Sequence, residues 1–281
     1  MRLGQVKVEG RLIAAVWEGD LARPIPSHTT LDLIKRAQTE NRQLSAVAAE
    51  LASRHAEKLA AALPVQPPEV WACGCTYEAS SSFRDAEHGT REGMYDYVYR
   101  EPRPEIFFKG TARVCVPSGQ PIGIRADSRF TAPEPELAVV LGNRGSIAGY
   151  TLANDVSAWD IERENPLYLP QSKVYDSCCA LGPVILTADA LPDPYALEIT
   201  CTIERGGQVI YTGSVSTSKL HRRLDALVAA LTFANRVPLG TVLLTGTGII
   251  VPQEAALAPG DIVRIRVPEI GELANTAALV G

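Results

Sequence analysis

The first residues of the chain alternate between hydrophobic and polar side chains. Residues 5–17 keep this alternation and then become apolar on either side of Gly10, which is typical of two strands joined by a tight turn. We therefore expect a small sheet at the start of the chain.

Two helical patterns follow this sheet. Thr29 and Thr30 can cap a helix with apolar residues at helical spacing, and a second pattern runs from Leu44 to Leu59. The proline-rich residues 64–68 end it, because proline donates no backbone hydrogen bond and disfavours helix in the residue before it. The pattern predicts a small N-terminal α+β domain over residues 1–66 and a second domain over residues 67–281.

From residue 70 onward, short apolar runs are separated by glycine, proline or asparagine, which favours strands and loops. The clearest hairpin joins residues 197–203 to 209–211 through two glycines. A helix is predicted after Ser216–Ser218, followed by strands at 242–245 and 262–267. Because strands and helices do not alternate regularly, we expect a β-rich α+β fold rather than a parallel α/β sheet.

Residues 77–104 are polar and contain several arginine, glutamate, tyrosine and serine residues. This composition fits a mobile lid over a site, and it fits a surface loop with a short helix equally well.

Composition narrows the function classes. The chain has 281 residues, 46% of them hydrophobic and 21% charged, which are ordinary values for a globular protein with a sizeable core. A net charge of −5 argues against nucleic-acid and anionic-membrane partners, because no surplus of basic residues exists to neutralise phosphates. Small molecules are the partners that we expect.

The six cysteines form no CxxC pair and no Cys/His zinc pattern, so we expect reduced, buried thiols. No apolar run reaches 18 residues, and the N-terminus alternates instead of forming a signal-peptide block. We expect a soluble, cytoplasmic protein.

Three acidic residues lie within otherwise apolar, strand-like segments. Glu134 and Glu136 stand two apart, so on a strand they point to the same face, and Asp155 follows a second apolar run. Taken alone, the glutamate pair also fits two solvated side chains on an exposed strand. Carboxylates held close in apolar surroundings raise one another's pKa unless a cation intervenes. We predict a hard divalent cation held by these three acids, with magnesium favoured and manganese or calcium suited to the same oxygen ligands.

Two lysines and one glycine-rich turn are further candidates. Lys173 follows a proline-containing segment, and Lys109 follows two phenylalanines, where a surface lysine is the alternative. A partly desolvated lysine near a metal can act as a base or can bind a carboxylate. The turn at residues 245–248, Thr-Gly-Thr-Gly, offers amides and hydroxyls to an anion, or is an ordinary turn.

The order of these segments resembles the fumarylacetoacetate hydrolase superfamily over about residues 70–281. The resemblance is carried by FxK, PExE, NDxSxxD, a lysine shortly before Leu181-Gly-Pro183, TGTG, Pro259-Gly-Asp261 and the segment Ile270 to Asn275. It implies a β-rich, roll-like catalytic domain behind a small N-terminal domain, a homo-oligomer, and magnesium on the acids matching Glu134, Glu136 and Asp155. It also implies that Lys173 matches the active-site lysine, Lys109 a site-lining lysine and Thr247 a substrate-contacting threonine.

Departures from the family pattern bear on the reaction. Hydrolases and decarboxylases of this superfamily usually carry a water-activating histidine and glutamate in a lid, whereas here Tyr77 is followed by Glu78 and no histidine until His88. Family members often have arginine where this chain has Trp159. Residues 160–171 instead resemble a branch that dehydrates 2-keto-3-deoxy sugar acids in pentose catabolism.

That resemblance implies magnesium-dependent dehydration of a 2-keto-3-deoxypentonate to 2,5-dioxopentanoate. We assign removal of the C3 proton to Lys173 and substrate contacts to Tyr77, Lys109 and Thr247. The acid that protonates the leaving 4-hydroxyl stays open between Glu78, Glu164 and a metal-bound water. The alternative function is hydrolysis or decarboxylation of a β-dicarbonyl acid of the acylpyruvate or oxaloacetate type.

Overall fold

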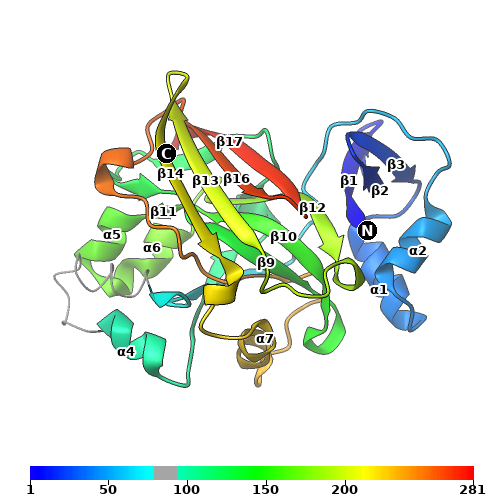
Figure 1. Ribbon diagram of the computed structural model, residues 1–281, viewed down its shortest axis with the longest axis horizontal. Coiled ribbons are helices and arrows are strands. Elements are labelled where there is room, and N and C mark those ends of the chain that lie inside the picture. Colours follow the sequence, from blue (N-terminus) through cyan, green and yellow to red (C-terminus); the bar gives the residue numbers. More distant parts are fainter. Residues whose placement is uncertain (79–93) are drawn as a thin grey trace.

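A large mixed sheet runs through the molecule (Figure 1). The computed structural model describes residues 1–78 and 94–281. The strand order is β3-β2-β1-β12-β10-β9-β15-β4-β5, with β6 paired to β12 beside this path. The strands are β1 (Arg2–Val8), β2 (Arg11–Glu18), β3 (Leu21–Ile25), β4 (Val70–Gly74), β5 (Glu105–Gly110), β6 (Cys115–Val116), β9 (Pro135–Leu141), β10 (Ile147–Asp155), β12 (Cys179–Thr187) and β15 (Val242–Leu244).

A second sheet packs against the central strands of the first, as Figure 1 shows for β13 and β16 in front of β9 and β10. Its order is β14-β13-β16-β17-β7, and a short β8–β11 pair lies apart. One buried cluster joins the two sheets and includes Leu137 and Val139 of β9 with Ile199 and Ile265 of the second sheet. These strands are β7 (Ile122–Arg125), β8 (Thr131–Ala132), β11 (Ser157–Ala158), β13 (Glu198–Arg205), β14 (Gln208–Ser216), β16 (Ile262–Val267) and β17 (Gly271–Val280).

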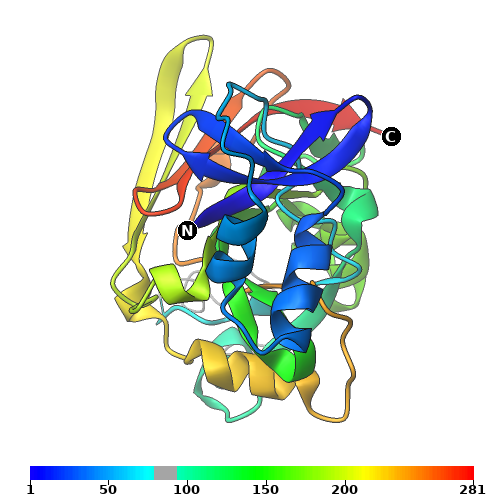
Figure 2. The same ribbon diagram turned by 90° about the vertical axis from the view of Figure 1, so that its right-hand side faces the viewer.

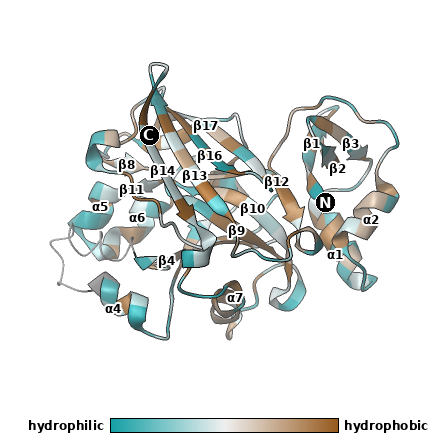
Figure 3. Ribbon diagram, in the orientation of Figure 1, coloured by the Kyte–Doolittle hydropathy of each residue, from teal (hydrophilic) through white to brown (hydrophobic). Residues whose placement is uncertain are grey.

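Figure 3 shows that hydrophobic residues concentrate on the strands of both sheets, whereas α5 is largely hydrophilic. The helices are α1 (Thr30–Thr39), α2 (Leu44–Leu51), α4 (Met94–Arg100), α5 (Trp159–Glu164), α6 (Leu169–Lys173) and α7 (Leu224–Thr232). The sheet-rich α+β fold predicted from the sequence is confirmed. Within the described residues, no helix is long and apolar enough to cross a membrane.

Several local predictions are confirmed. The first two strands meet at Gly10, whose φ of +81° favours glycine. Thr29 caps α1 in a capping box with Asp32. The hairpin of β13 and β14 turns at Gly206 and Gly207.

Two helix boundaries were predicted wrongly. The second helix ends at Leu51 instead of continuing to residue 59, because the following segment bonds to strands: the Ala22 amide donates to Glu57 O at 2.8 Å, and the Ala62 amide donates to Gln5 O at 2.8 Å. Tertiary pairing of the backbone therefore overrides the helical pattern. The later helix begins at Leu224, because residues 217–219 form a separate 3-10 turn.

The predicted lid falls partly outside the described residues. Of residues 77–104, the segment 79–93, which includes His88, lies in the part that the structure does not describe. Met94–Arg100 forms α4, so a short helix is present in the described part of this segment.

The N-terminal strands extend the large sheet directly. Arg2 and Leu3 of β1 pair antiparallel with Leu186 and Ile185 of β12. In Figure 2 the N-terminal strands lie above α1 and α2, toward the viewer. The domain boundary near residue 66 stays a prediction, because strands from both sides of it share one sheet.

Candidate active site

Three carboxylates meet where β9 begins and β10 ends. The antiparallel register places Glu136 opposite Ala153, and the Asp155 amide donates to Glu134 O at 3.0 Å. One potential ligand atom from each of Glu134, Glu136 and Asp155 lies within 4.8 Å of the others. Their exposed fractions are 3%, 0% and 1%, so the cluster lies inside the protein.

The sequence of β9 explains this placement. Glu136, Ala138 and Val140 share one face because strand side chains alternate. Ala138 and Val140 belong to the buried cluster that also contains Ala153 and Leu244. Glu136 is therefore followed along its face of β9 by buried apolar residues, which exclude water from that side of the cluster.

Two buried lysines reach the acids from different elements. Lys173, at the end of α6, donates to Glu134 Oε1 at 2.8 Å, Asp155 Oδ2 at 3.1 Å and Ser157 Oγ at 2.6 Å. The Lys109 ammonium on β5 lies 2.6 Å from Asp155 Oδ1 and donates to Val156 O at 3.0 Å. Burial alone lowers the pKa of Lys109, but the Asp155 carboxylate outweighs it, so the pKa rises and the ammonium stays charged.

The buried Glu136 carboxylate is the acid of the cluster whose charge is least well compensated. Its Oε2 accepts the Gly246 amide, whereas its buried Oε1 has no hydrogen-bond partner within the described residues. Burial raises the pKa of Glu136 well above its ordinary value, and the Asp155 and Glu134 carboxylates raise it further.

A divalent cation fits this donor set. With all three acids ionised, the carboxylates and the two ammonium groups leave one net negative charge, which a divalent cation converts to one net positive charge. The cluster offers oxygen donors only, and magnesium, manganese and calcium prefer oxygen ligands. The buried Oε1 of Glu136, which has no partner among the described residues, would gain one.

The Thr-Gly-Thr-Gly turn supports the cluster directly. Gly246 has a φ of +91°, and a side chain there would collide with Thr76 Oγ1 at 2.0 Å, so glycine is required. This conformation directs the Gly246 amide onto Glu136 Oε2. The anion that the turn binds is therefore a side chain of the protein itself.

Two predicted substrate contacts lie next to this turn. Thr247 is buried, and its Oγ1 accepts from the Ile249 amide at 3.1 Å. Tyr77 is buried, and a side chain added at Gly248 would meet its ring. Burial and then the Glu136 carboxylate raise the pKa of Tyr77, so its phenol stays protonated.

The two glutamates predicted as proton donors lie at the surface. Glu78 is exposed at the edge of the described residues, and Glu164 is exposed at the end of α5. Glu162, two residues earlier on α5, is 3% exposed, and Ser172 Oγ lies 3.5 Å from its Oε2. The structure thus brings Glu162, rather than Glu164, beside the residue that precedes Lys173.

Glu105 is a second residue that the sequence reasoning missed. Alternation along β5 puts Glu105, Phe107 and Lys109 on one face, and the Lys173 ammonium lies 5.4 Å from the Phe107 ring centre. The Glu105 carboxylate covers Gly74, where any side chain would collide with it. Glu105 stands four residues before Lys109, so the strand alternation that singled out Glu134 and Glu136 could also have placed Glu105 on the face of that lysine.

Glu105 and Glu162 line one cavity of about 350 Å³. The other lining residues come from α4, the segment before β5 and the α5–α6 region: Val98, Arg103, Pro104, Pro166 and Leu169. Two carboxyl groups therefore face a space large enough for a small sugar acid.

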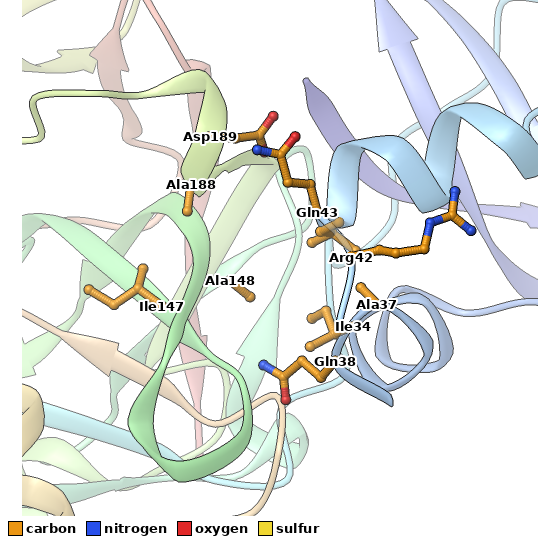
Figure 4. Close-up of a pocket in the computed structure, with 10 residues that line it drawn as sticks. Ile34, Ala37, Gln38, Arg42, Gln43, Ile147, Ala148, Ala188 and Asp189 are labelled. Atoms are coloured by element: carbon orange, nitrogen blue, oxygen red, sulfur yellow. The ribbon is translucent and has the colours of Figure 1, made fainter. Parts of the chain in front are cut away.

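A different cavity, of about 180 Å³, lies between the N-terminal helices and β10 (Figure 4). Figure 4 shows Arg42 pointing away from Ile147 and Ala148. Arg42 is paired with Glu40 and Glu50, and Asp189 accepts from Ser45 Oγ at 2.7 Å. The charged side chains that line this cavity thus have partners within the protein. We interpret the cavity as a packing gap.

Comparisons with known proteins agree with this geometry. Residues 82–278 match the family model described as fumarylacetoacetate (FAA) hydrolase C-terminal. The chain is 48% identical to the 2-dehydro-3-deoxy-D-arabinonate dehydratase of Saccharolobus solfataricus over 75% of this chain and 72% of that protein. It is 44% identical to the "Probable 2-keto-3-deoxyxylonate dehydratase" of Haloferax volcanii, over 93% of this chain and 88% of that protein.

A solved structure of 2-keto-3-deoxy-D-arabinonate dehydratase complexed with magnesium and 2,5-dioxopentanoate superposes with a TM-score of 0.86 at 38% identity. The match covers 100% of this chain and 99% of the other. The resemblance expected from the motifs is confirmed: this chain belongs to the fumarylacetoacetate hydrolase family.

Proposed function

We propose that this protein is a magnesium-dependent hydro-lyase that dehydrates a 2-keto-3-deoxypentonate to 2,5-dioxopentanoate. The observation that carries this proposal is the buried cluster of Glu134, Glu136 and Asp155 with the ammonium groups of two lysines bound to it. The names of the two relatives and the ligands of the solved complex support the same substrate class.

The three acids would hold the magnesium ion. When bound, magnesium supplies Lewis-acid polarisation of a 2-oxo acid, which makes the C3 protons more acidic. With the ion included, the cluster and its two lysines carry one net positive charge, which favours the substrate carboxylate. Lys109 stays charged and holds Asp155 in place through the 2.6 Å ion pair.

Two side chains compete for removal of the C3 proton. Lys173 is the group that we propose first, because it lies among the acids, but there its ammonium donates hydrogen bonds to Glu134 and Asp155, and it must lose a proton before it can remove one. Glu105 can accept a proton in its charged form and lines the same cavity as Glu162. Replacing each residue separately distinguishes them, because only the true base is needed for exchange of the C3 proton with solvent.

Dehydration to the aldehyde needs more than one proton transfer. Loss of the C3 proton and of the protonated 4-hydroxyl as water leaves a C3–C4 double bond. A proton must then leave C5 and another join C3, after which the resulting C4–C5 enol becomes the aldehyde by losing its hydroxyl proton and gaining one at C4. Glu162, buried beside the same cavity as Glu105, is the group that we propose as the acid.

A substrate panel tests the proposed function. Purified protein is incubated with 2-keto-3-deoxy pentonates, 2-keto-3-deoxy hexonates and acylpyruvates, with magnesium and with EDTA. We expect aldehyde formation from a pentonate with magnesium only. Turnover of the acylpyruvates with the sugar acids inert would replace the proposal by the hydrolase alternative.

Assembly and location are separate proposals. We propose a homo-oligomer in the cytoplasm, as the family resemblance implies. Light scattering of the purified protein measures its mass, and a mass of 30.2 kDa would contradict the oligomer.

A further inference from the structure

The indole of Trp159 donates a hydrogen bond to an acid of the proposed metal site. Its Nε1 lies 2.6 Å from Glu134 Oε1. Trp159 is 4% exposed and Glu134 is 3% exposed, so both partners of this bond lie out of water. A short bond from a neutral donor to a buried carboxylate is strong, because water does not compete for either partner.

The chain around Trp159 fixes the indole in place. The Trp159 amide donates to Phe130 O at 2.9 Å, and the two rings pack edge to face with centres 5.3 Å apart. The Arg163 guanidinium lies 4.8 Å from the Phe130 ring centre and 5.8 Å from that of Trp159. The indole thus has a fixed direction that is set by residues outside the acid cluster.

We propose that Trp159 is a positioning residue that orients the Glu134 carboxylate for the divalent cation. This inference rests on the proposed function, because it concerns the same metal site. Lys173 also donates to Glu134 Oε1, at 2.8 Å, but its charge opposes a divalent cation. The indole is neutral, so it orients the carboxylate without adding positive charge next to the ion. Partners of this kind commonly change metal affinity by about 10- to 100-fold when removed.

The matched control is Trp71 on β4. Its Nε1 donates to Glu69 Oε2 at 2.9 Å, which is the same type of bond at a site apart from the three acids. Trp71→Phe removes this bond, and Trp159→Phe removes the bond to Glu134. Comparing the two separates loss of an indole bond in general from loss of the bond at the cluster.

The experiment is calorimetric titration of magnesium into the metal-free full chain. We expect wild type and Trp71→Phe to bind alike and Trp159→Phe to bind about tenfold more weakly or worse. In the dehydration assay, Trp159→Phe should need more magnesium for half-maximal rate and should regain most of its kcat at saturating magnesium. An unchanged magnesium affinity in Trp159→Phe would overturn the inference.

A second substitution covers the case in which phenylalanine disturbs the fold. Benzothienylalanine at position 159 keeps the two-ring shape of the indole and lacks its N–H, and the same replacement at position 71 is the control. Weaker magnesium binding only for the position 159 variant supports the inference, and equal binding overturns it. Wild-type protein that binds no magnesium would instead overturn the metal site and the proposed function with it.

Discussion

The acid cluster and the cavity of Figure 4 both lie beside strand β10, and they differ in how their charges are satisfied. At the cavity of Figure 4, Arg42 and Asp189 are both exposed, and each has a polar partner. At the cluster, Glu136 is completely buried, and its Oε1 has no partner within the described residues. Since an unsatisfied buried carboxylate is costly, its presence indicates a ligand rather than a packing role.

Lys173→Met is the variant for which we expect the largest effect. The substitution removes the ammonium that bonds Glu134, Asp155 and Ser157, so turnover should fall by about 10³-fold or more. Magnesium binding should persist, because the three acids remain. The exposed Lys219→Met is the control for loss of a lysine. Full dehydration activity in Lys173→Met would remove this residue from the mechanism.

Glu162→Gln and Glu164→Gln form a matched pair on α5. Glu162 is buried beside the cavity and Glu164 is exposed, so we expect about a 10²-fold loss of kcat only for Glu162→Gln. Steady-state kinetics with saturating magnesium measures the difference. Equal losses for the two variants would contradict the assignment of Glu162.

Glu136→Gln should separate stability from function. The pKa of Glu136 is higher in the folded state than in the unfolded state, where it is about 4.5. The folded state therefore binds the proton more tightly, which stabilises the fold below pH 4.5. This stabilisation is lost as the pH rises through the folded-state pKa. Metal-free wild type should therefore lose stability as pH rises above about 4.5, and Glu136→Gln should lose less.

Thermal unfolding with and without magnesium measures this effect. Near pH 7 the metal-free variant should melt above wild type, by about 2–4 °C for each kcal/mol gained, and saturating magnesium should reverse the order. A metal-free variant that melts below wild type at this pH would show that the Glu136 charge is already compensated within the protein.

Gln38→Ala should have the smallest effect. Gln38 donates to Ser146 Oγ at 2.9 Å and accepts from the Asn143 amide, so its loss should cost about 1 kcal/mol per bond and lower Tm by a few degrees. Turnover and magnesium affinity should stay unchanged. A large loss of activity would show that the contact of Gln38 with Ser146 and Asn143 acts on the site.

Sequence patterns could identify the acids of the cluster because their grouping follows from local rules. Glu136 lies on β9, Glu134 stands directly before the first residue of that strand, and Asp155 ends the next strand in an antiparallel pair. The capping box at Thr29 is likewise local. Such features need only a few neighbouring residues.

Other parts of the site depend on contacts between distant segments. Glu105 reaches the cavity through the pairing of β5 with β4, where it lies opposite Gly74. The bond from Trp159 to Glu134 depends on the packing of α5 against Phe130. The early end of α2 depends on backbone pairing with residues near Ala22. Strand alternation gives the face on which Glu105 lies, but no periodicity in the sequence encodes the partner in any of these three contacts.

Magnesium titration of the metal-free protein and its single variants shows whether the three acids bind the ion. Glu136→Ala and Asp155→Ala each remove one acid from the cluster, and Asp189→Ala removes an acid at the cavity of Figure 4 as a control. We predict one magnesium site in wild type and Asp189→Ala, with affinity lost in Glu136→Ala and Asp155→Ala. Unchanged magnesium affinity in both cluster variants would contradict this prediction.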